Sequence, residues 1–349
     1  MIEYSERESG VFSGNRILIT GVCGTIGSEL LRQSLELGAE EVVGLDNNEM
    51  SVFFLAEQYR AEPKVKLFFA DARDLDSLSQ HMKGVQIVIH AAALKHVIVC
   101  ERSPRDAIRT NIIGVQNVID AALANGVGRV VFTSSDKAVN PTNVMGTSKL
   151  MGERLMTAAS ALGQVGGTVF ASTRFGNVLG SRGSVIPVFL AQIRKGGPVT
   201  ITDDRMTRFI MSIEESVRLV LDSVSMARGG EVFVTKMPSI RIIDLARIMI
   251  DELSEVTGRS SEELAIEKIG SKAGEKLYEE LLSEEETRRA VELERYFVIL
   301  PAFRAVYDNI EYDYPGIVSS NVAQPYNSRR QAPMQAEKIR SFLKEHSLI

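Results

Sequence analysis

Short apolar runs alternate with helical patterns through the first half of the chain. Six runs rich in Val, Ile and Phe are predicted strands: residues 16–19, 41–45, 65–69, 85–89, 130–132 and 168–170. Stretches with helical periodicity lie between them, such as residues 28–37 and 105–124, and each ends at or just before a glycine. Strands that are apolar on both faces are typical of parallel sheets. The alternation therefore predicts an α/β fold with a doubly wound parallel sheet.

The pattern changes after about residue 175, where glycines and prolines interrupt the chain. A helix at 214–227, a strand at 231–235 and a helix at 243–254 are predicted beyond this point. We therefore expect a smaller, irregular substrate-binding part whose elements partly return to the main sheet. The predicted divisions are an N-terminal extension (1–15), a dinucleotide-binding domain (16–175), the substrate-binding part (176–305) and a C-terminal tail (306–349).

A glycine-rich turn joins the first predicted strand to the first helix. Gly21, Gly24 and Gly27 have the spacing that lets a pyrophosphate approach a helix N-terminus, and Thr25 and Ile26 lie in the same turn. Taken alone, this pattern also fits an ordinary tight turn between a strand and a helix. The ends of the next strands favour a bound dinucleotide in a Rossmann-type domain, because they offer an acid for the adenosine ribose, an adenine contact and small residues: Asp46, Asp71-Ala72 and Ala91-Ala92-Ala93.

Asp46 also bears on the choice of dinucleotide. Its carboxylate would repel the 2′-phosphate of NADP, and residues 46–50 contain no Arg or Lys to neutralise that phosphate. The sequence therefore favours NAD over NADP as the cofactor.

Polar residues follow the fifth predicted strand in the order Ser134-Ser135-Asp136-Lys137. Met145 and Lys149 come next, four residues apart, and would lie on one face of a helix. The order of glycine turn, strand-end serine and helical lysine resembles the extended short-chain dehydrogenase/reductase superfamily. The usual signature of that superfamily is Tyr-x-x-x-Lys, and Met145 stands here in place of the tyrosine.

Longer motifs narrow this resemblance. They are HAAALKHV at 90–97, SSDKAVNPTNVMGTSK at 134–149, FGNVLGSRGSVIPVF at 175–189 and GEKLYEELL at 274–282. Together they resemble the nucleotide-sugar 4,6-dehydratases of polysaccharide biosynthesis, which act in capsule, flagellin and protein-glycosylation pathways. The resemblance covers roughly residues 14–290. Inverting members keep the tyrosine and several retaining members have methionine, so the resemblance implies a retaining, NAD-dependent UDP-N-acetylglucosamine 4,6-dehydratase.

The resemblance also implies roles for the polar residues. Ser135 would hydrogen-bond the sugar C4 oxygen, Asp136 would be the acid at C6 and Lys137 the base at C5. Lys149 would hold the nicotinamide ribose, with Lys95 and Ser134 also near the cofactor. A lysine acts as a base only if its pKa falls, through burial or through neighbouring positive charge, which Lys149 and the nicotinamide of the cofactor could supply. Two other interpretations stay open. Asp136 and Lys137 could form an ordinary ion pair on the surface at a strand end, and Lys149 could be an ordinary helical residue exposed to solvent.

The substrate contacts come from the resemblance as well. Asn177 would meet the sugar diphosphate, and the remaining contacts to nucleoside and diphosphate would be Ser184, Val185, Pro187, Arg208, Lys272 and Glu275. Lys95 and His96 are candidates too, although they could merely cap the fourth strand. Many relatives have Arg-Pro-Gly-Glu where this chain has Lys272-Ala273-Gly274-Glu275. Because lysine cannot make the two-pronged contact of arginine, the choice between UDP and GDP stays open.

Composition excludes several other classes of protein. The chain has 349 residues, 44% of them hydrophobic and 24% charged, as in ordinary globular enzymes. A net charge of −5 gives no overall basic field for nucleic acid, the two cysteines exclude a disulfide framework, and the scattered histidines indicate no metal site. With no signal peptide and no long apolar run, we expect a cytoplasmic homo-oligomer with no membrane partner, similar to the soluble members of the family.

Two alternative functions remain at this point. A nucleotide-sugar 4-epimerase could use the same scaffold, but it would not need Asp136-Lys137 and normally depends on the tyrosine. A catalytically dead NAD-binding regulatory protein would explain the missing tyrosine. It would not explain why Ser135, Asp136, Lys137 and Lys149 are all present.

Overall fold

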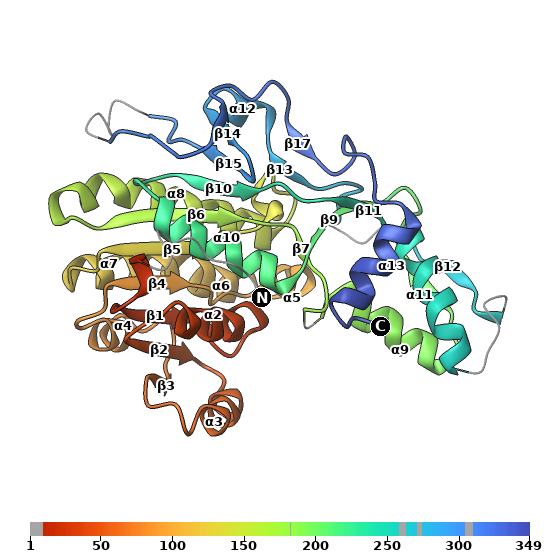
Figure 1. Ribbon diagram of the computed structural model, residues 1–349, viewed down its shortest axis with the longest axis horizontal. Helices are drawn as coiled ribbons and strands as arrows, with labels where there is room; N and C mark the ends of the chain where they lie inside the picture. Colours follow the sequence, from red (N-terminus) through yellow and green to blue (C-terminus); the bar gives the residue numbers. More distant parts are fainter. Residues whose placement is uncertain (1–9, 182, 258–262, 271–273, 304–309) are drawn as a thin grey trace.

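The computed structural model describes residues 10–181, 183–257, 263–270, 274–303 and 310–349. Within these residues a ten-stranded sheet forms the centre, in the order β16-β14-β15-β10-β6-β5-β4-β1-β2-β3 (Figure 1). The strands from β3 to β10 run parallel, whereas β15, β14 and β16 are antiparallel additions. The chain reverses its direction of travel across the sheet between β1 and β4, which is where open α/β sheets bind ligands.

The predicted strands are found close to their expected positions. The parallel strands are β1 (Arg16–Thr20), β2 (Glu41–Asp46), β3 (Val65–Phe69), β4 (Ile87–His90), β5 (Arg129–Thr133), β6 (Val169–Arg174) and β10 (Val232–Thr235). The order β3-β2-β1-β4-β5-β6 confirms the predicted doubly wound parallel sheet.

Helices cover both faces of this sheet, which explains the apolar strands (Figure 1). Leu18 packs on the side of α4 (Leu75–His81), α7 (Gly114–Ala124) and α8 (Val144–Gly166). Its neighbours Ile17 and Ile19 pack on the opposite side, against α2 (Thr25–Glu36) and α10 (Ile213–Met226). A strand buried in this way carries apolar side chains at every position. The helix α3 (Glu49–Gln58) lies beside the edge strand β3.

The single helix predicted over residues 105–124 is wrong in one respect. The structure has α6 (Pro104–Ile108), a π-helical turn (Arg109–Ile113) and then α7. The turn places the Asn111 side chain under the loop after β4, where it accepts from the Leu94 N–H at 2.8 Å and donates to the Leu94 carbonyl at 2.9 Å. Its amide also donates to Ser148 Oγ at 2.9 Å. Such turns are frequent near functional sites, and this one supports the site loop.

The smaller part of the molecule lies to one side of the main sheet (Figure 1). It has its own apolar core. It contains α9 (Val185–Lys195), α11 (Ile242–Thr257), β8 (Val199–Ile201) and β12 (Ile266–Lys268). Phe189 of α9 packs with Leu245 and Met249 of α11. A three-stranded sheet of β7 (Asn177–Val178), β9 (Thr207–Met211) and β11 (Ser239–Arg241) lies between this part and the main sheet.

The predicted C-terminal tail (306–349) is not a separate division, because its described strands and helix are built into the fold. β16 (Ile317–Ser319) pairs with β14 (Ala290–Leu293), which in turn pairs with β15 (Tyr296–Ile299). β17 (Tyr326–Asn327) pairs with β13 (Glu280–Leu282), and α13 (Ala336–Glu345) packs on α11. The first nine residues of the predicted N-terminal extension lie outside the described residues.

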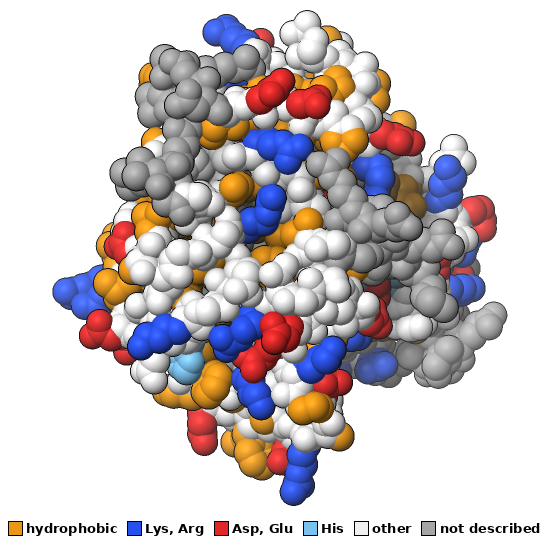
Figure 2. Space-filling model, turned by 60° about the vertical axis from the view of Figure 1, so that its left-hand side comes forward, with side chains coloured by type: hydrophobic (Ala, Val, Ile, Leu, Met, Phe, Trp, Pro, Cys, Tyr) orange, Lys and Arg blue, Asp and Glu red, His pale blue; other side chains and the backbone are white. Residues whose placement is uncertain are grey.

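The surface carries charges of both signs. On the face shown in Figure 2, Lys and Arg side chains alternate with Asp, Glu and apolar ones. Among the described helices, none has the length and apolar character that crossing a membrane requires.

Candidate active site

A cavity of about 720 Å³ lies at the carboxyl ends of the parallel strands. It extends from the glycine turn after β1 to the segment around β7. All the predicted cofactor residues line it: Gly21, Gly24, Thr25, Ile26, Gly27, Asp46, Asp71, Ala72, Ala91, Ala92, Ala93, Lys95, Ser134 and Lys149. The structure therefore brings together residues that the sequence separates by more than a hundred positions.

The glycine turn has the geometry of a pyrophosphate cradle. Gly21 has a φ of +70°, and a Cβ on Gly27 would lie 2.1 Å from the Gly21 carbonyl oxygen. Gly24 precedes the first residue of α2, and no side chain caps that helix end. The turn thus needs glycine at these positions and presents the start of a helix, which attracts an anion. These residues fit the phosphates of a dinucleotide.

The adenosine end of the cavity contains a cation that the sequence argument overlooked. Asp46 faces the cavity, and its carboxylate accepts hydrogen bonds from the Cys23 and Asn48 N–H groups, both at 3.0 Å. Arg73 also lines the cavity, and its Nε lies 2.9 Å from Asp71 Oδ1. The hydrogen bonds from Arg73 lower the pKa of Asp71 to about 2, against the effect of burial. Residues 46–50 contain no Arg or Lys, but the folded site contains Arg73, which pairs with Asp71.

Lys149 and Met145 lie on one face of α8, as predicted, and both line the cavity. Lys149 is buried, and its Nζ donates to the Thr133 carbonyl at 2.8 Å. Burial lowers its pKa to about 8. The interpretation of Lys149 as a solvated helical residue is therefore wrong. Met145 packs among Cys100 and Ala107 beside the cavity wall.

The Asp136-Lys137 pair is part of the site and not a surface pair, so that interpretation is also wrong. Asp136 is 2% exposed, and its Oδ1 accepts from Ser135 Oγ at 2.6 Å and from Lys137 Nζ at 3.1 Å. Ser135 and Lys137 line the cavity, with Asp136 behind them. Ser134, the neighbouring predicted cofactor contact, donates its hydroxyl hydrogen to Glu153 at 2.6 Å.

The charge state of Lys137 differs from the expectation. Burial alone would lower its pKa, but the negative charges of Asp136 and Glu279 outweigh burial and raise it. Lys137 Nζ lies 3.2 Å from Glu279 Oε1. In the protein alone the amine is therefore an ammonium ion. The predicted lowering of its pKa by the nearby charge of Lys149 is contradicted, because the neighbouring carboxylates dominate.

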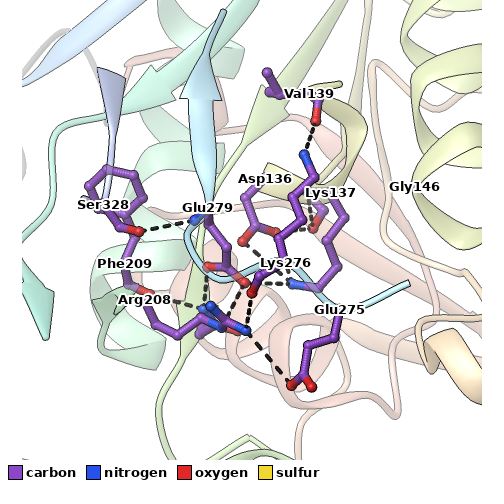
Figure 3. Close-up of polar contacts among 12 residues, drawn as sticks. Asp136, Lys137, Val139, Gly146, Arg208, Phe209, Glu275, Lys276, Glu279 and Ser328 are labelled. Atoms are coloured by element: carbon purple, nitrogen blue, oxygen red, sulfur yellow. Dashed lines mark hydrogen bonds and ion pairs between the residues drawn. The ribbon is translucent and has the colours of Figure 1, made fainter. Parts of the chain in front are cut away.

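Sequence reasoning missed Glu279, which is central to this cluster (Figure 3). Its carboxylate accepts from Asn177 Nδ2 at 2.6 Å and lies 3.3 Å from Arg208 Nε. The residue is 142 positions from Lys137 and stands in the motif GEKLYEELL. That motif was a usable signal, but adjacent Glu279 and Glu280 look alike in sequence, and only the fold shows which one enters the site.

The other predicted substrate residues fall into three groups. Lys95, His96, Asn177 and Ser184 line the cavity, whereas Val185, Pro187, Arg208 and Glu275 lie outside its lining. Arg208 Nη2 and Glu275 Oε1 are 3.8 Å apart, and Lys272 lies outside the described residues. β4 ends at His90 and His96 directly precedes α5 (Val97–Arg102), so Lys95 and His96 do not cap the fourth strand.

Among the residues that the structure describes, no three His, Cys, Asp or Glu side chains are grouped to hold a metal ion.

Comparison with known proteins places the site in a family. A relative in Methanocaldococcus jannaschii, named as an uncharacterised membrane protein, is 44% identical over 98% of both chains. A UDP-N-acetylglucosamine 4,6-dehydratase (inverting) of Campylobacter jejuni is 40% identical, covering 85% of this chain and 86% of its own. A UDP-glucose 4-epimerase of Rickettsia canadensis is 37% identical over 95% and 96% of the two chains.

A solved structure agrees over nearly the whole fold. The X-ray structure of Pen from Bacillus thuringiensis superposes with a TM-score of 0.90 at 38% identity, covering 97% of this chain and 99% of that one. The family model described as polysaccharide biosynthesis protein matches residues 17–301, which include every described residue of the cavity. The chain therefore belongs to the polysaccharide biosynthesis protein family, as the sequence motifs indicate.

Proposed function

We propose that the protein is an NAD-dependent nucleotide-sugar 4,6-dehydratase acting on UDP-N-acetylglucosamine with retention at C5. The main supporting observation is the position of the Asp136-Lys137 pair. It lies against a cavity that also contains the glycine turn and Asn177. An acid and an amine beside a dinucleotide cradle suit water elimination, which simple oxidation or epimerisation does not require. The 40% identical dehydratase of Campylobacter jejuni supports the same reaction.

The residues can divide the proton transfers among themselves. Bound NAD would supply the hydride acceptor for C4 and return the hydride to C6. Asp136, whose pKa is lowered chiefly by Lys137 against the effect of burial, is ionised and can take the C4 hydroxyl proton through Ser135. It then gives a proton to the departing C6 hydroxyl. Lys137 removes the C5 proton and later returns it, so every proton is accounted for.

Met145 supports the stereochemical part of the proposal. It stands one turn before Lys149 and lines the cavity, at the position of the tyrosine in the family signature. A thioether cannot donate a proton, so Lys137 has to return the C5 proton to the face it came from. The product then keeps the glucose-series configuration. The Campylobacter jejuni relative is named inverting. The proposal of retention for this chain therefore rests on Met145 and not on that relative.

The preference for NAD rests on Asp46. Its carboxylate faces the cavity, and the nearby Arg73 is paired with Asp71. A 2′-phosphate would meet the charge of Asp46 and would have to compete with Asp71 for Arg73.

The decisive experiment is incubation of the purified protein with UDP- and GDP-N-acetylglucosamine. We expect the UDP sugar to lose 18 Da, about the mass of one water, and to show a C4 ketone with unchanged C5 configuration by NMR. Lys137→Ala should lower the rate by roughly 10²–10⁴-fold. Lys66→Ala, on the exposed edge strand β3, serves as the control. Recovery of unchanged substrate from the wild type, or an inverted C5, would contradict the proposal.

A 4-epimerase is the second candidate, favoured by the Rickettsia canadensis relative that covers 95% of this chain. UDP-glucose distinguishes the two reactions, because an epimerase returns a C4 epimer of unchanged mass. A protein that binds NAD and changes neither sugar would instead have a regulatory role.

A further inference from the structure

Glu279 is a buried carboxylate that the roles above leave unassigned. It is 4% exposed, and its two oxygens contact three side chains of the site (Figure 3). Oε1 lies 3.2 Å from Lys137 Nζ and 3.3 Å from Arg208 Nε, while Oε2 accepts from Asn177 at 2.6 Å. The carboxylate therefore joins the proposed base to the substrate-binding part.

The main chain fixes Glu279 in this position. Its N–H donates to Ser328 Oγ at 3.0 Å, and its carbonyl accepts from the Ser328 N–H at 2.8 Å. These bonds continue the pairing of β13 with β17. The C-terminal segment thus holds the carboxylate against Lys137, which gives that segment a function in the site.

Charged groups from several elements face this contact. Asp136 lies beside Glu279 and pairs with the same amine, and Arg208 of β9 lies beside Glu279 and Glu275 (Figure 3). Lys276 donates to the Val139 carbonyl at 2.7 Å and pairs with Glu280 at 3.8 Å. Lys137 is thus enclosed by two carboxylates, Asp136 and Glu279.

We propose that Glu279 is a positioning residue that controls the protonation of Lys137 and takes its proton when substrate fills the cavity. The proposal rests on the proposed dehydratase function. The step is one proton transfer from Nζ to Oε1 across their contact, which leaves a neutral amine for C5 and a neutral carboxyl. Asp136 cannot serve as this acceptor, because it handles the C4 and C6 protons.

Two features favour an internal acceptor. Lys137 is 29% exposed and lines the cavity, so a bound sugar would cover the side of the amine that reaches water. Burial and the charge of Asp136 raise the pKa of Glu279, which makes this carboxylate a better proton acceptor than an ordinary glutamate.

The first test needs no substrate turnover. Lys137 is labelled with acetic anhydride across a pH series, and its modification is measured by peptide mass spectrometry in the wild type, Glu279→Gln, Glu279→Asp and Glu280→Gln. The labelling midpoint is the pH at which Lys137 is half modified. Because Glu279→Gln removes one negative charge from Lys137, its midpoint should lie roughly 1–3 pH units below that of the wild type. Glu279→Asp keeps the charge and Glu280→Gln removes a neighbouring charge that contacts Lys276, so both should stay near the wild type.

The second test measures turnover against pH with UDP-N-acetylglucosamine. Without an internal acceptor, Lys137 of Glu279→Gln must lose its proton to solvent. The acid limb of kcat should therefore move to higher pH by about one unit or more, opposite to the labelling shift. A purely structural role for Glu279 would produce neither shift.

The outcomes separate the two proposals. An unchanged labelling midpoint in Glu279→Gln overturns the role of Glu279 whatever the substrate is. A lowered midpoint with an unchanged acid limb rejects the proton transfer. If the wild type leaves the sugar unchanged while labelling shifts as expected, the proposed function fails and the control of Lys137 by Glu279 stands.

Discussion

Arg174, the last residue of β6, offers a quantitative test of how the fold supports the site. It is 1% exposed and donates five hydrogen bonds. Two go to Glu153 of α8 at 2.6 and 2.9 Å, and two go to Glu286 of α12 (Glu284–Thr287) at 2.9 and 3.0 Å. The fifth reaches the Leu281 carbonyl of β13 at 3.0 Å, close to Glu279. One guanidinium thus joins the main sheet, a helix and the strand that follows Glu279.

Arg174→Met removes the cation and leaves two buried carboxylates without their partner. Breaking a buried ion pair in this way costs about 3–5 kcal/mol of unfolding free energy. The loss should depend on pH. Burial would raise the pKa of Glu286, but Arg174 outweighs burial and holds it at about 2. In the wild type this depressed pKa contributes stability above the unfolded value of 4.5, and the contribution is lost as pH falls toward 2.

Without Arg174, burial raises the pKa of Glu286 above its unfolded value, so the penalty is fully present above that raised pKa and disappears as pH falls through it toward 4.5, while the wild type loses stability below 4.5. The gap in stability should therefore be largest near neutral pH and smaller in acid. Urea unfolding followed by circular dichroism at neutral and mildly acidic pH measures it. Arg32→Met is the matched control, because Arg32 is 44% exposed, pairs with Glu29 and Glu36 on the surface of α2, and should cost less than about 1 kcal/mol. A loss below about 1 kcal/mol for Arg174→Met, or a gap independent of pH, would refute the reasoning.

Three further predictions concern the cofactor, the methionine and the assembly. Asp46→Ala should weaken NAD binding and reduce discrimination against NADP by calorimetry; a wild type that prefers NADP tenfold, or about 1.4 kcal/mol, would contradict the role of Asp46. Met145→Leu should keep most dehydratase activity because the residue only packs, and a folded but inactive variant would give its sulfur a role. Light scattering should show a homo-oligomer, since the helices beside the sheet expose Ile98, Ile108, Ile113 and Met151; a monomer at all micromolar concentrations would disprove this.

The parallel half of the sheet could be predicted from sequence because its physical signal is local. Strands buried on both faces must be apolar throughout, and the glycine turn must follow the first of them. The π-helical turn at residues 109–113 gave no such signal, because one extra residue leaves the apolar pattern almost unchanged. The strands β14 and β16 escaped detection because short antiparallel additions gain their apolar character from pairing within the fold.

The charge pairs and protonation states of the site could be predicted from the sequence only in part. Asp136 and Lys137 are adjacent, so their pairing is local, but the second carboxylate on Lys137 comes from 142 residues away. At the adenosine end, Arg73 is close in sequence to its partner Asp71, but only the fold brings this pair to the cavity that Asp46 faces. Motifs identify which chemical groups enter the cavity, whereas their protonation depends on every charge within a few ångströms. The proposal that Lys137 is the base thus needs an acceptor for the proton of its ammonium group, which is the role that we propose for Glu279.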